Sequence, residues 1–134
     1  MASAGAGWPE GTGGGRGGRF SVEVRPEPDP DIVVLTLTGE LDHDTAEPLR
    51  AALDEAIATG ARRIVADCHG LLFCDSTGLN VLLRARLAAQ DTDARVELAA
   101  LRPQVARMLT ITGAGAVFPR YASLGEALAG RRQE

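Results

Sequence analysis

An alternation of strand-like and helix-like segments constrains the fold of this chain more than any other feature. Apolar residues alternate or run together, as in strands, over 20–24, 32–37, 64–66 and 95–99. Between and after these segments they recur three or four positions apart, as on the buried face of a helix. The first two strands, joined by a short proline-rich loop, should pair antiparallel. The later alternation favours parallel crossovers, so we expect an α/β fold: a small mixed sheet of about four to five strands packed with about four helices.

The helix starts are marked by capping residues. Asp44 or Thr45 is suited to cap the first helix, because either side chain can accept from its unpaired N–H groups. A second helix is expected over about 77–89, a third opens at Pro103, and Ser123 begins a capping box for a last one. The expected core-facing residues of the third helix are Val105, Met108, Leu109 and Thr112.

The N-terminal segment differs in composition from the rest of the chain. Residues 1–19 hold eight of the 16 glycines and almost nothing to bury, which predicts a flexible tail. These glycines lack the Gly-Lys-Ser/Thr ending of a phosphate-binding loop. The folded domain should therefore span residues 20–131. Only 4% of the residues are aromatic, so its core must be aliphatic.

Charge and cysteine content exclude several classes of function. The net charge of −4 argues against nucleic-acid binding through phosphate neutralisation, since all 14 basic residues are arginines that are scattered apart from the doublets at 62–63 and 131–132. No apolar run is long enough to span a bilayer, and the N-terminus lacks a signal-peptide pattern. Cys68 and Cys74, without a secretory signal, are expected to be reduced thiols. These features predict a soluble cytoplasmic protein with no nucleic-acid or membrane partner.

The sequence Asp75-Ser76-Thr77-Gly78 carries the strongest functional signal. The apolar segment 71–74 ends directly before this motif, and the apolar residues of an expected helix follow directly after it. Asp, Ser and Thr all cap helices well, because their oxygens accept from the free N–H groups of the first turn. Residue types alone leave two readings open: a well-capped helix, or a helix start that presents a hydroxyl to a partner.

Two stretches resemble the motifs of one family. Residues 39–46 read Gly-Glu-Leu-Asp-His-Asp-Thr-Ala, and residues 73–79 read Phe-Cys-Asp-Ser-Thr-Gly-Leu. Both resemble the STAS-domain anti-sigma factor antagonists, in which the first strand pair ends in Gly-Glu-Leu-Asp and the second motif usually reads Asp-Ser-Ser-Gly-Leu-Gly. The resemblance covers roughly residues 20–130 and implies a single STAS-like domain.

The resemblance implies a role for Ser76. In this family the serine directly after the motif's Asp is phosphorylated by a partner anti-sigma factor, usually a serine kinase that uses ATP and magnesium. By position that serine is Ser76, with Thr77 as a second candidate acceptor. The unphosphorylated protein binds the anti-sigma factor and frees a sigma factor. Phosphorylation ends the binding and a phosphatase resets the cycle, so this chain would be a binding protein and substrate, without enzymatic activity or a cofactor.

Residues of both motifs form the candidate partner-binding surface. They are Asp42, His43, Asp44, Thr45, Asp75, Thr77, Gly78, Leu79 and Asn80. Thr77 stands where the family often has a second serine and keeps the hydroxyl. Asn80 replaces the usual glycine and puts a side chain one turn into the helix, which can alter the fit of a partner. A phosphate adds about −1.5 to −2 charges, so the hypothesis is a charge switch at an interface.

Three alternatives are weaker. A metal site built from Cys68, His69, Cys74 and His43 matches no recurrent zinc spacing, so no metal is expected. A serine hydrolase would need the Gly-x-Ser-x-Gly elbow, whose first glycine is here Cys74. A scaffold or regulatory subunit of another phospho-signalling complex remains an alternative use of the same fold. The sequence leaves the oligomeric state open.

Overall fold

Strands and helices alternate in the order expected from the sequence. The structure, a computed structural model, describes residues 19–130. Its elements are β1 (Phe20–Pro26), β2 (Ile32–Leu41), α1 (Ala46–Ala58), β3 (Arg63–Cys74), α2 (Ser76–Gln90), β4 (Arg95–Ala99), α3 (Pro103–Thr112), the 3₁₀ turn η2 (Ala114–Val117), β5 (Arg120–Tyr121) and α4 (Leu124–Leu128). Residues 1–18 of the predicted tail lie outside the described residues, whereas Arg19 lies within them and pairs with Asp42.

The strands form one sheet in the order β1-β2-β3-β4-β5. β1 pairs antiparallel with β2, and every later pair is parallel. The predicted mixed sheet is thus confirmed, as is the antiparallel first pair. The strands are longer than the sequence pattern indicated, because β2 continues to Leu41 and β3 continues to Cys74. Both extensions lead directly into the motif loops.

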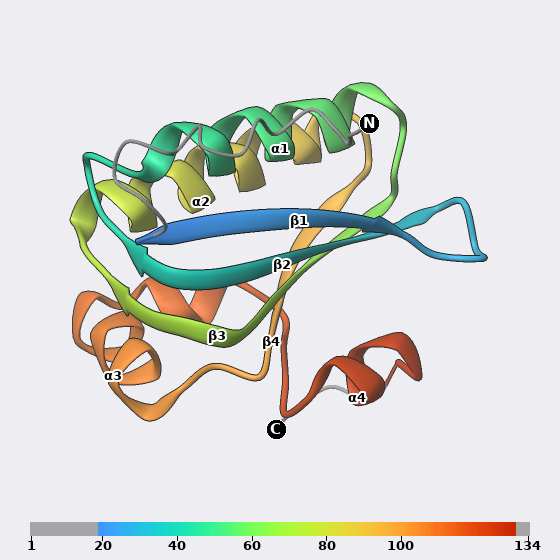
Figure 1. Ribbon diagram of the computed structural model, residues 1–134. Coiled ribbons are helices and arrows are strands. Elements are labelled where there is room, and N and C mark those ends of the chain that lie inside the picture. Colours follow the sequence, from blue (N-terminus) through green and yellow to red (C-terminus); the bar gives the residue numbers. More distant parts are fainter. Residues whose placement is uncertain (1–18, 131–134) are drawn as a thin grey trace.

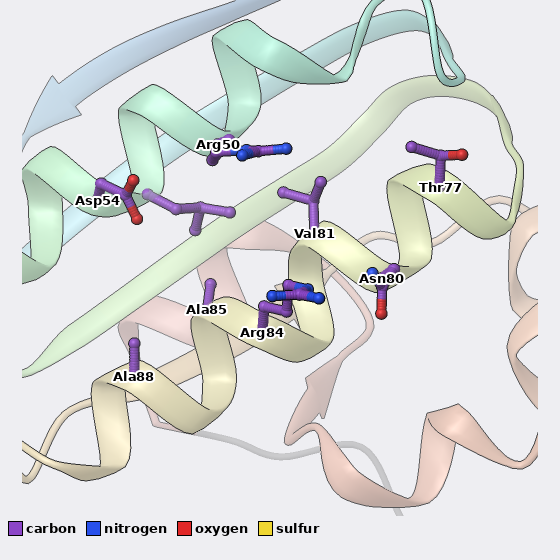
Figure 2. A pocket seen from close by; sticks show the side chains of 9 residues that line it. Arg50, Asp54, Thr77, Asn80, Val81, Arg84, Ala85 and Ala88 are labelled. Carbon is purple, nitrogen blue, oxygen red and sulfur yellow. The ribbon is translucent and has the colours of Figure 1, made fainter.

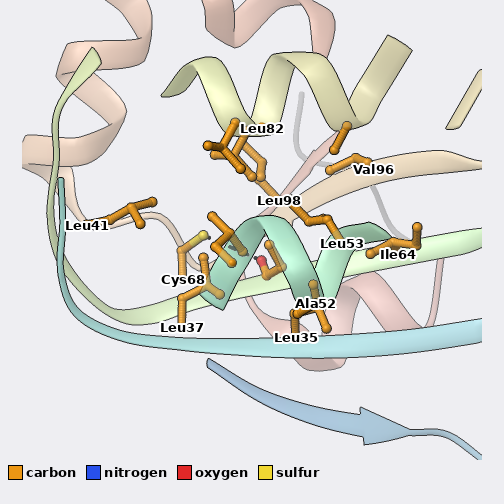
Figure 3. Close-up of a cluster of buried hydrophobic side chains, with 14 of the residues drawn as sticks. Leu35, Leu37, Leu41, Ala52, Leu53, Ile64, Cys68, Leu82, Val96 and Leu98 are labelled. Atoms are coloured by element: carbon orange, nitrogen blue, oxygen red, sulfur yellow. Dashed lines mark hydrogen bonds between the residues drawn. The ribbon is translucent and has the colours of Figure 1, made fainter. Parts of the chain in front are cut away.

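An aliphatic core lies between the sheet and the helices α1 and α2, which lie side by side on one face (Figure 1). Leu35 and Leu37 of β2 meet Leu53 of α1 and Leu82 of α2 in this core, which Figure 3 shows in close-up. Burial of such side chains is the main favourable term in folding. The expectation of a core built from aliphatic residues is confirmed.

Helix α3 lies beside the second half of β3, beyond the end of β4. Arg102 Nε donates to the His69 carbonyl at 2.7 Å, and Gln104 Nε2 donates to the Leu72 carbonyl at 3.2 Å. Of the residues predicted to face the core, Val105 and Leu109 are buried and Met108 is half-buried. Thr112 is exposed, contrary to the prediction. It is the last residue of α3, and its hydroxyl donates to the Leu109 carbonyl, which has no partner in the next helical turn.

The other face of the sheet carries a buried charge under α4. Glu97 of β4 is 0% exposed and lies between Arg63, at 2.7 Å, and Arg95, at 3.0 Å. Arg63 Nη2 also donates to the Ala127 carbonyl of α4 at 2.8 Å. A buried carboxylate is tolerated only when it is paired and hydrogen-bonded, and these contacts meet that condition.

No helix within residues 19–130 has both the length and the apolar character needed to cross a bilayer.

Candidate functional site

Ser76 is the first residue of α2 and is exposed. Asp75 precedes it in an extended conformation (φ −95°, ψ −174°), and its carboxylate accepts from the Gly78 N–H at 3.0 Å. Asp75 therefore makes the side-chain cap of the helix, and the Ser76 hydroxyl is left out of it. The helix predicted to begin near Thr77 begins one residue earlier, which places Ser76 among the free N–H groups of the first turn.

The approach to Ser76 along β3 contains two register shifts. Thr36 and Thr38 of β2 face Asp67 and Gly70, and Gly39 and Glu40 face Leu71 and Phe73. Each shift inserts an extra residue into β3, as in a β-bulge. The second shift turns two successive apolar side chains outward, so that Leu72 is 46% exposed and Phe73 is 49% exposed. An exposed apolar pair thus comes just before Ser76 in the chain.

The Gly39–Ala46 motif lies against the Ser76 motif. The Asp75 N–H donates to the Leu41 carbonyl at 3.0 Å, which joins the end of β2 to the start of α2. Gly78 packs under the Leu41 side chain, because a Cβ added at Gly78 would lie 2.6 Å from Leu41 Cγ. The two motifs, which begin at residues 39 and 73, therefore form one surface at the carboxyl edge of β2 and β3.

Hydrogen bonds inside the loop before α1 fix its shape. The Thr45 hydroxyl donates to the Glu40 carbonyl at 2.9 Å and accepts from the Asp42 N–H at 2.9 Å. One oxygen of the Asp42 carboxylate accepts from the Asp44 N–H, also at 2.9 Å. Thr45 does occupy the N-cap of α1, as expected, but its side chain makes no cap bond to the helix. It closes the preceding loop instead.

Arg19 binds the other oxygen of the Asp42 carboxylate, at 2.5 Å from its Nη2. Desolvation acts to raise the pKa of Asp42, but the hydrogen bond from the Asp44 N–H, the contact with the polar Thr45 side chain and the Arg19 charge lower it overall. Asp42 is therefore ionised at neutral pH. The sequence analysis missed Arg19 because it assigned the residue to the tail. The available signal was its position just before the first predicted strand, which was expected to pair antiparallel with the strand that leads into the Gly39–Ala46 motif.

The predicted phosphorylation site and the predicted partner-binding residues differ in exposure. Ser76, Asn80, His43 and Asp44 are exposed, and Thr77, Asp75 and Asp42 are half-buried. Gly78, Leu79 and Thr45 are buried. The structure thus brings both predicted segments together, and the buried members pack beneath the surface that the exposed ones form. His43 Nε2 lies 3.2 Å from Asp44 Oδ1 at the outer rim of the loop.

A groove between α1 and α2 leads away from this surface. It has a volume of about 300 Å³ and begins near Thr77. It is lined by Arg50, Leu53, Asp54, Thr77, Asn80, Val81, Arg84, Ala85 and Ala88. Figure 2 shows Asn80 and Arg84 on α2 and Arg50 and Asp54 on the facing side of α1. The groove is thus contiguous with the surface that the two motifs form around Ser76, called the Ser76 surface below. Its walls carry charges of both signs.

The cysteines and histidines do not form a reactive cluster. Cys68 and Cys74 are free and buried. Burial raises the pKa of both thiols, that of Cys74 to about 12, so both are neutral at physiological pH. His69 is exposed while the adjacent Cys68 is buried, so they cannot share a metal ion. Residues 19–130 contain no group of three His, Cys, Asp or Glu side chains placed to hold one.

Comparison with known proteins gives consistent matches. The family described as "Mlab, STAS domain" matches residues 24–119. An anti-sigma F factor antagonist of Paenibacillus polymyxa is 29% identical over 103 residues, which cover 76% of this chain and 88% of that protein. The structure of the anti-sigma factor antagonist SpoIIAA in its unphosphorylated form has a TM-score of 0.71 at 28% identity, covering 82% of this chain and 95% of that one. The phosphorylated form of SpoIIAA, a Bacillus cell fate determinant, has a TM-score of 0.65 at 27% identity, over 82% and 98%.

Proposed function

The chain belongs to the STAS domain family, as its two motifs predicted, and we propose that it binds an anti-sigma factor through the Ser76 surface and is released when Ser76 is phosphorylated. The observation that carries this proposal is an exposed serine at the first turn of a 15-residue helix, left free by the Asp75 cap. Its relatives include anti-sigma factor antagonists, and SpoIIAA is known in both phosphorylated and unphosphorylated forms.

The local structure suits the reversible addition of a phosphate. Free N–H groups and the positive end of the α2 dipole lie at Ser76, and both stabilise negative charge. The exposed serine makes no contribution to the α2 cap, so its modification leaves the cap in place. The fold can therefore accept the phosphate without rearrangement, and the effect falls on whatever binds the surface.

The surroundings explain why a partner would leave. Asp75 adjoins Ser76 in the chain, and the neighbouring loop adds Asp42 and the exposed Asp44. Two further charges on Ser76 would raise the negative potential there and oblige the partner to desolvate a phosphate. The exposed apolar pair Leu72 and Phe73 offers the unphosphorylated surface an area that a partner can bury.

The other components of the cycle follow from this role. The kinase is the anti-sigma factor itself, which carries the ATP, and a separate phosphatase acts on phosphorylated Ser76. The chain has neither catalytic activity nor a cofactor in this scheme. Release of a sigma factor is a step of bacterial transcription control, so a cytoplasmic location is part of this proposal.

The test uses the full chain as bait in the native cytosol with ATP and magnesium, followed by mass-spectrometric mapping of phosphate. Wild type should recover an ATP-binding anti-sigma factor and acquire phosphate on Ser76. Ser76→Ala should recover the same protein without becoming phosphorylated, whereas Thr77→Ala should be phosphorylated at Ser76. Ser21→Ala, at an exposed serine of β1, is the matched control and should behave as wild type.

Two results would contradict the proposal. Phosphate confined to Thr77 would move the switch to the neighbouring residue. Failure of both wild type and Ser76→Ala to bind any anti-sigma factor would refute the antagonist role and favour another regulatory use of the fold.

A further inference from the structure

Arg19 is fastened to the loop before α1 by its backbone as well as its side chain. The Glu40 N–H donates to the Arg19 carbonyl at 2.6 Å. Gly39 has φ +103°, and the Arg19 carbonyl occupies the space that a Cβ would need. The close approach thus requires glycine at position 39, since other residues disfavour this backbone conformation. The backbone of Arg19 is therefore held against the start of the loop, and its side chain extends from there to Asp42, farther along the same loop.

The side chain of Arg19 reaches Asp42, which organises the rest of the loop. Arg19 Nη2 binds Asp42 Oδ2, while Asp42 Oδ1 accepts from the Asp44 N–H and lies 3.1 Å from the Thr45 hydroxyl. The two side chains of the pair are 37% and 21% exposed, so the contact is only partly screened by water. Without Arg19, the Asp42 carboxylate would lose its cation in a strongly acidic loop.

We propose that Arg19 is a positioning residue of the proposed partner site, which acts through Asp42 to hold residues 42–45 in the shape that a partner meets beside Ser76. This inference rests on the proposed function, and it adds a residue outside both motifs to the recognition surface. The connection is physical, because the loop is joined to the start of α2 by the bond from the Asp75 N–H to the Leu41 carbonyl. The charge of Arg19 also contributes to the lowered pKa of Asp42.

The first test needs no partner and follows amide hydrogen exchange by NMR in the full chain. In Arg19→Ala, the Asp44 N–H, which donates to Asp42, should exchange about three- to tenfold faster, as expected for loss of a partly exposed charged contact. Amides of the central strand, such as that of Val65, should be unchanged. Arg19→Lys should restore most of the protection, because only Nη2 contacts Asp42. Arg25→Ala, at an exposed arginine of β1, the strand that follows Arg19, is the matched control.

A double-mutant cycle separates positioning through Asp42 from simple packing. In an Asp42→Asn background, Arg19→Ala should change the exchange of the Asp44 N–H less than twofold, because the ion pair is already gone. Equal acceleration in both backgrounds would show that Arg19 acts independently of Asp42 and would overturn the proposal. Unchanged exchange in Arg19→Ala alone would overturn it as well.

The second test measures the initial rate of Ser76 phosphorylation in native cytosol with ATP. Arg19→Ala should be phosphorylated at least about twofold more slowly than Arg25→Ala, because a smaller fraction of the molecules holds residues 42–45 in the shape that the partner meets. A normal rate despite faster exchange would refute a role in recognition while leaving the proposed switch intact. Absence of phosphorylation in wild type would instead refute the proposed function, and with it the recognition role, whereas the exchange data would still decide whether Arg19 positions the loop.

Discussion

The two loops at the carboxyl edge of the sheet, before α1 and before α2, end in similar capping residues whose side chains point in opposite directions along the chain. Before α1, the Thr45 hydroxyl turns back into its own loop and bonds the backbone of Glu40 and Asp42. Before α2, the Asp75 carboxylate turns forward and caps the helix at Gly78, which leaves Ser76 exposed. In the first loop the Thr45 hydroxyl stabilises the loop itself, whereas in the second the Ser76 hydroxyl stays available for modification.

This difference indicates how a fold can carry a modifiable residue safely. A hydroxyl that stabilises the fold cannot be phosphorylated without loss of its hydrogen bonds, whereas one that stabilises nothing can. The division of labour between Asp75 and Ser76 meets that requirement. Substitutions in the two loops should therefore differ sharply in their effects on the free energy of unfolding.

The largest effect is expected for Thr45→Val. The change keeps the shape of the buried side chain but leaves the Glu40 carbonyl and the Asp42 N–H without their partner, which should cost about 1–3 kcal/mol. Urea denaturation measures the change. Thr45→Ser, which retains the hydroxyl, should lose less, and equal losses in the two variants would show that the hydroxyl is not what matters.

Gly78→Ala should be nearly as damaging. A Cβ at this position would lie 2.6 Å from Leu41 Cγ and 3.0 Å from Cys74 Sγ, so the contact between the loops must open. Overpacking of this kind outweighs the gain in helix propensity and should cost about 1–2 kcal/mol net. Gly125→Ala in α4 is the matched control, because its nearest neighbour would lie 3.8 Å away. That variant should be neutral or more stable, and similar losses at both sites would argue against a specific contact.

Asp75→Ala should cost about 1 kcal/mol through loss of the α2 cap. Asp75→Asn keeps an oxygen that can accept from the Gly78 N–H, so it should retain most of the stability. Thermal denaturation of the three proteins provides the comparison. If Asn were as damaging as Ala, the role of Asp75 would depend on its charge and not on the cap.

The smallest effect is expected for Ser76→Ala. Because the exposed serine takes no part in the cap, its free energy of unfolding should stay within about 0.5 kcal/mol of wild type. Ser21→Ala on β1 should give the same result. A loss above 1 kcal/mol only for Ser76→Ala would mean that this hydroxyl helps to hold the fold, and the contrast between the loops would fail.

The main elements could be predicted because their patterns are local. Alternation over 20–24 and helical stripes in α1 and α2 follow from which face is buried, and the capping residues place Ser76 at a helix start to within one residue. The motif resemblance then identified the residue of interest. None of these inferences required knowledge of which distant segments meet.

The missed features all depend on contacts between distant segments. Asp67, His69 and Gly70 interrupt the apolar run of β3, so only 64–66 looked like a strand, although pairing with β2 extends it to Cys74. Arg19 gains its role from the register between β1 and β2. Glu97 looked like one more strand residue, and its burial is made tolerable only by Arg63 of the adjacent β3, by Arg95 on its own strand, and by α4, whose Ala127 carbonyl accepts from Arg63.

The central claim is that negative charge at Ser76, and not elsewhere on the same helix, ends partner binding. The most direct measurement is the affinity of the recovered anti-sigma factor for Ser76→Asp and for Gln90→Glu, titrated calorimetrically against wild type. Gln90 is the last residue of α2, about 20 Å along the helix from Ser76. Ser76→Asp should bind at least roughly tenfold more weakly, and Gln90→Glu should bind within about twofold of wild type. Equal affinities for all three proteins would contradict the account.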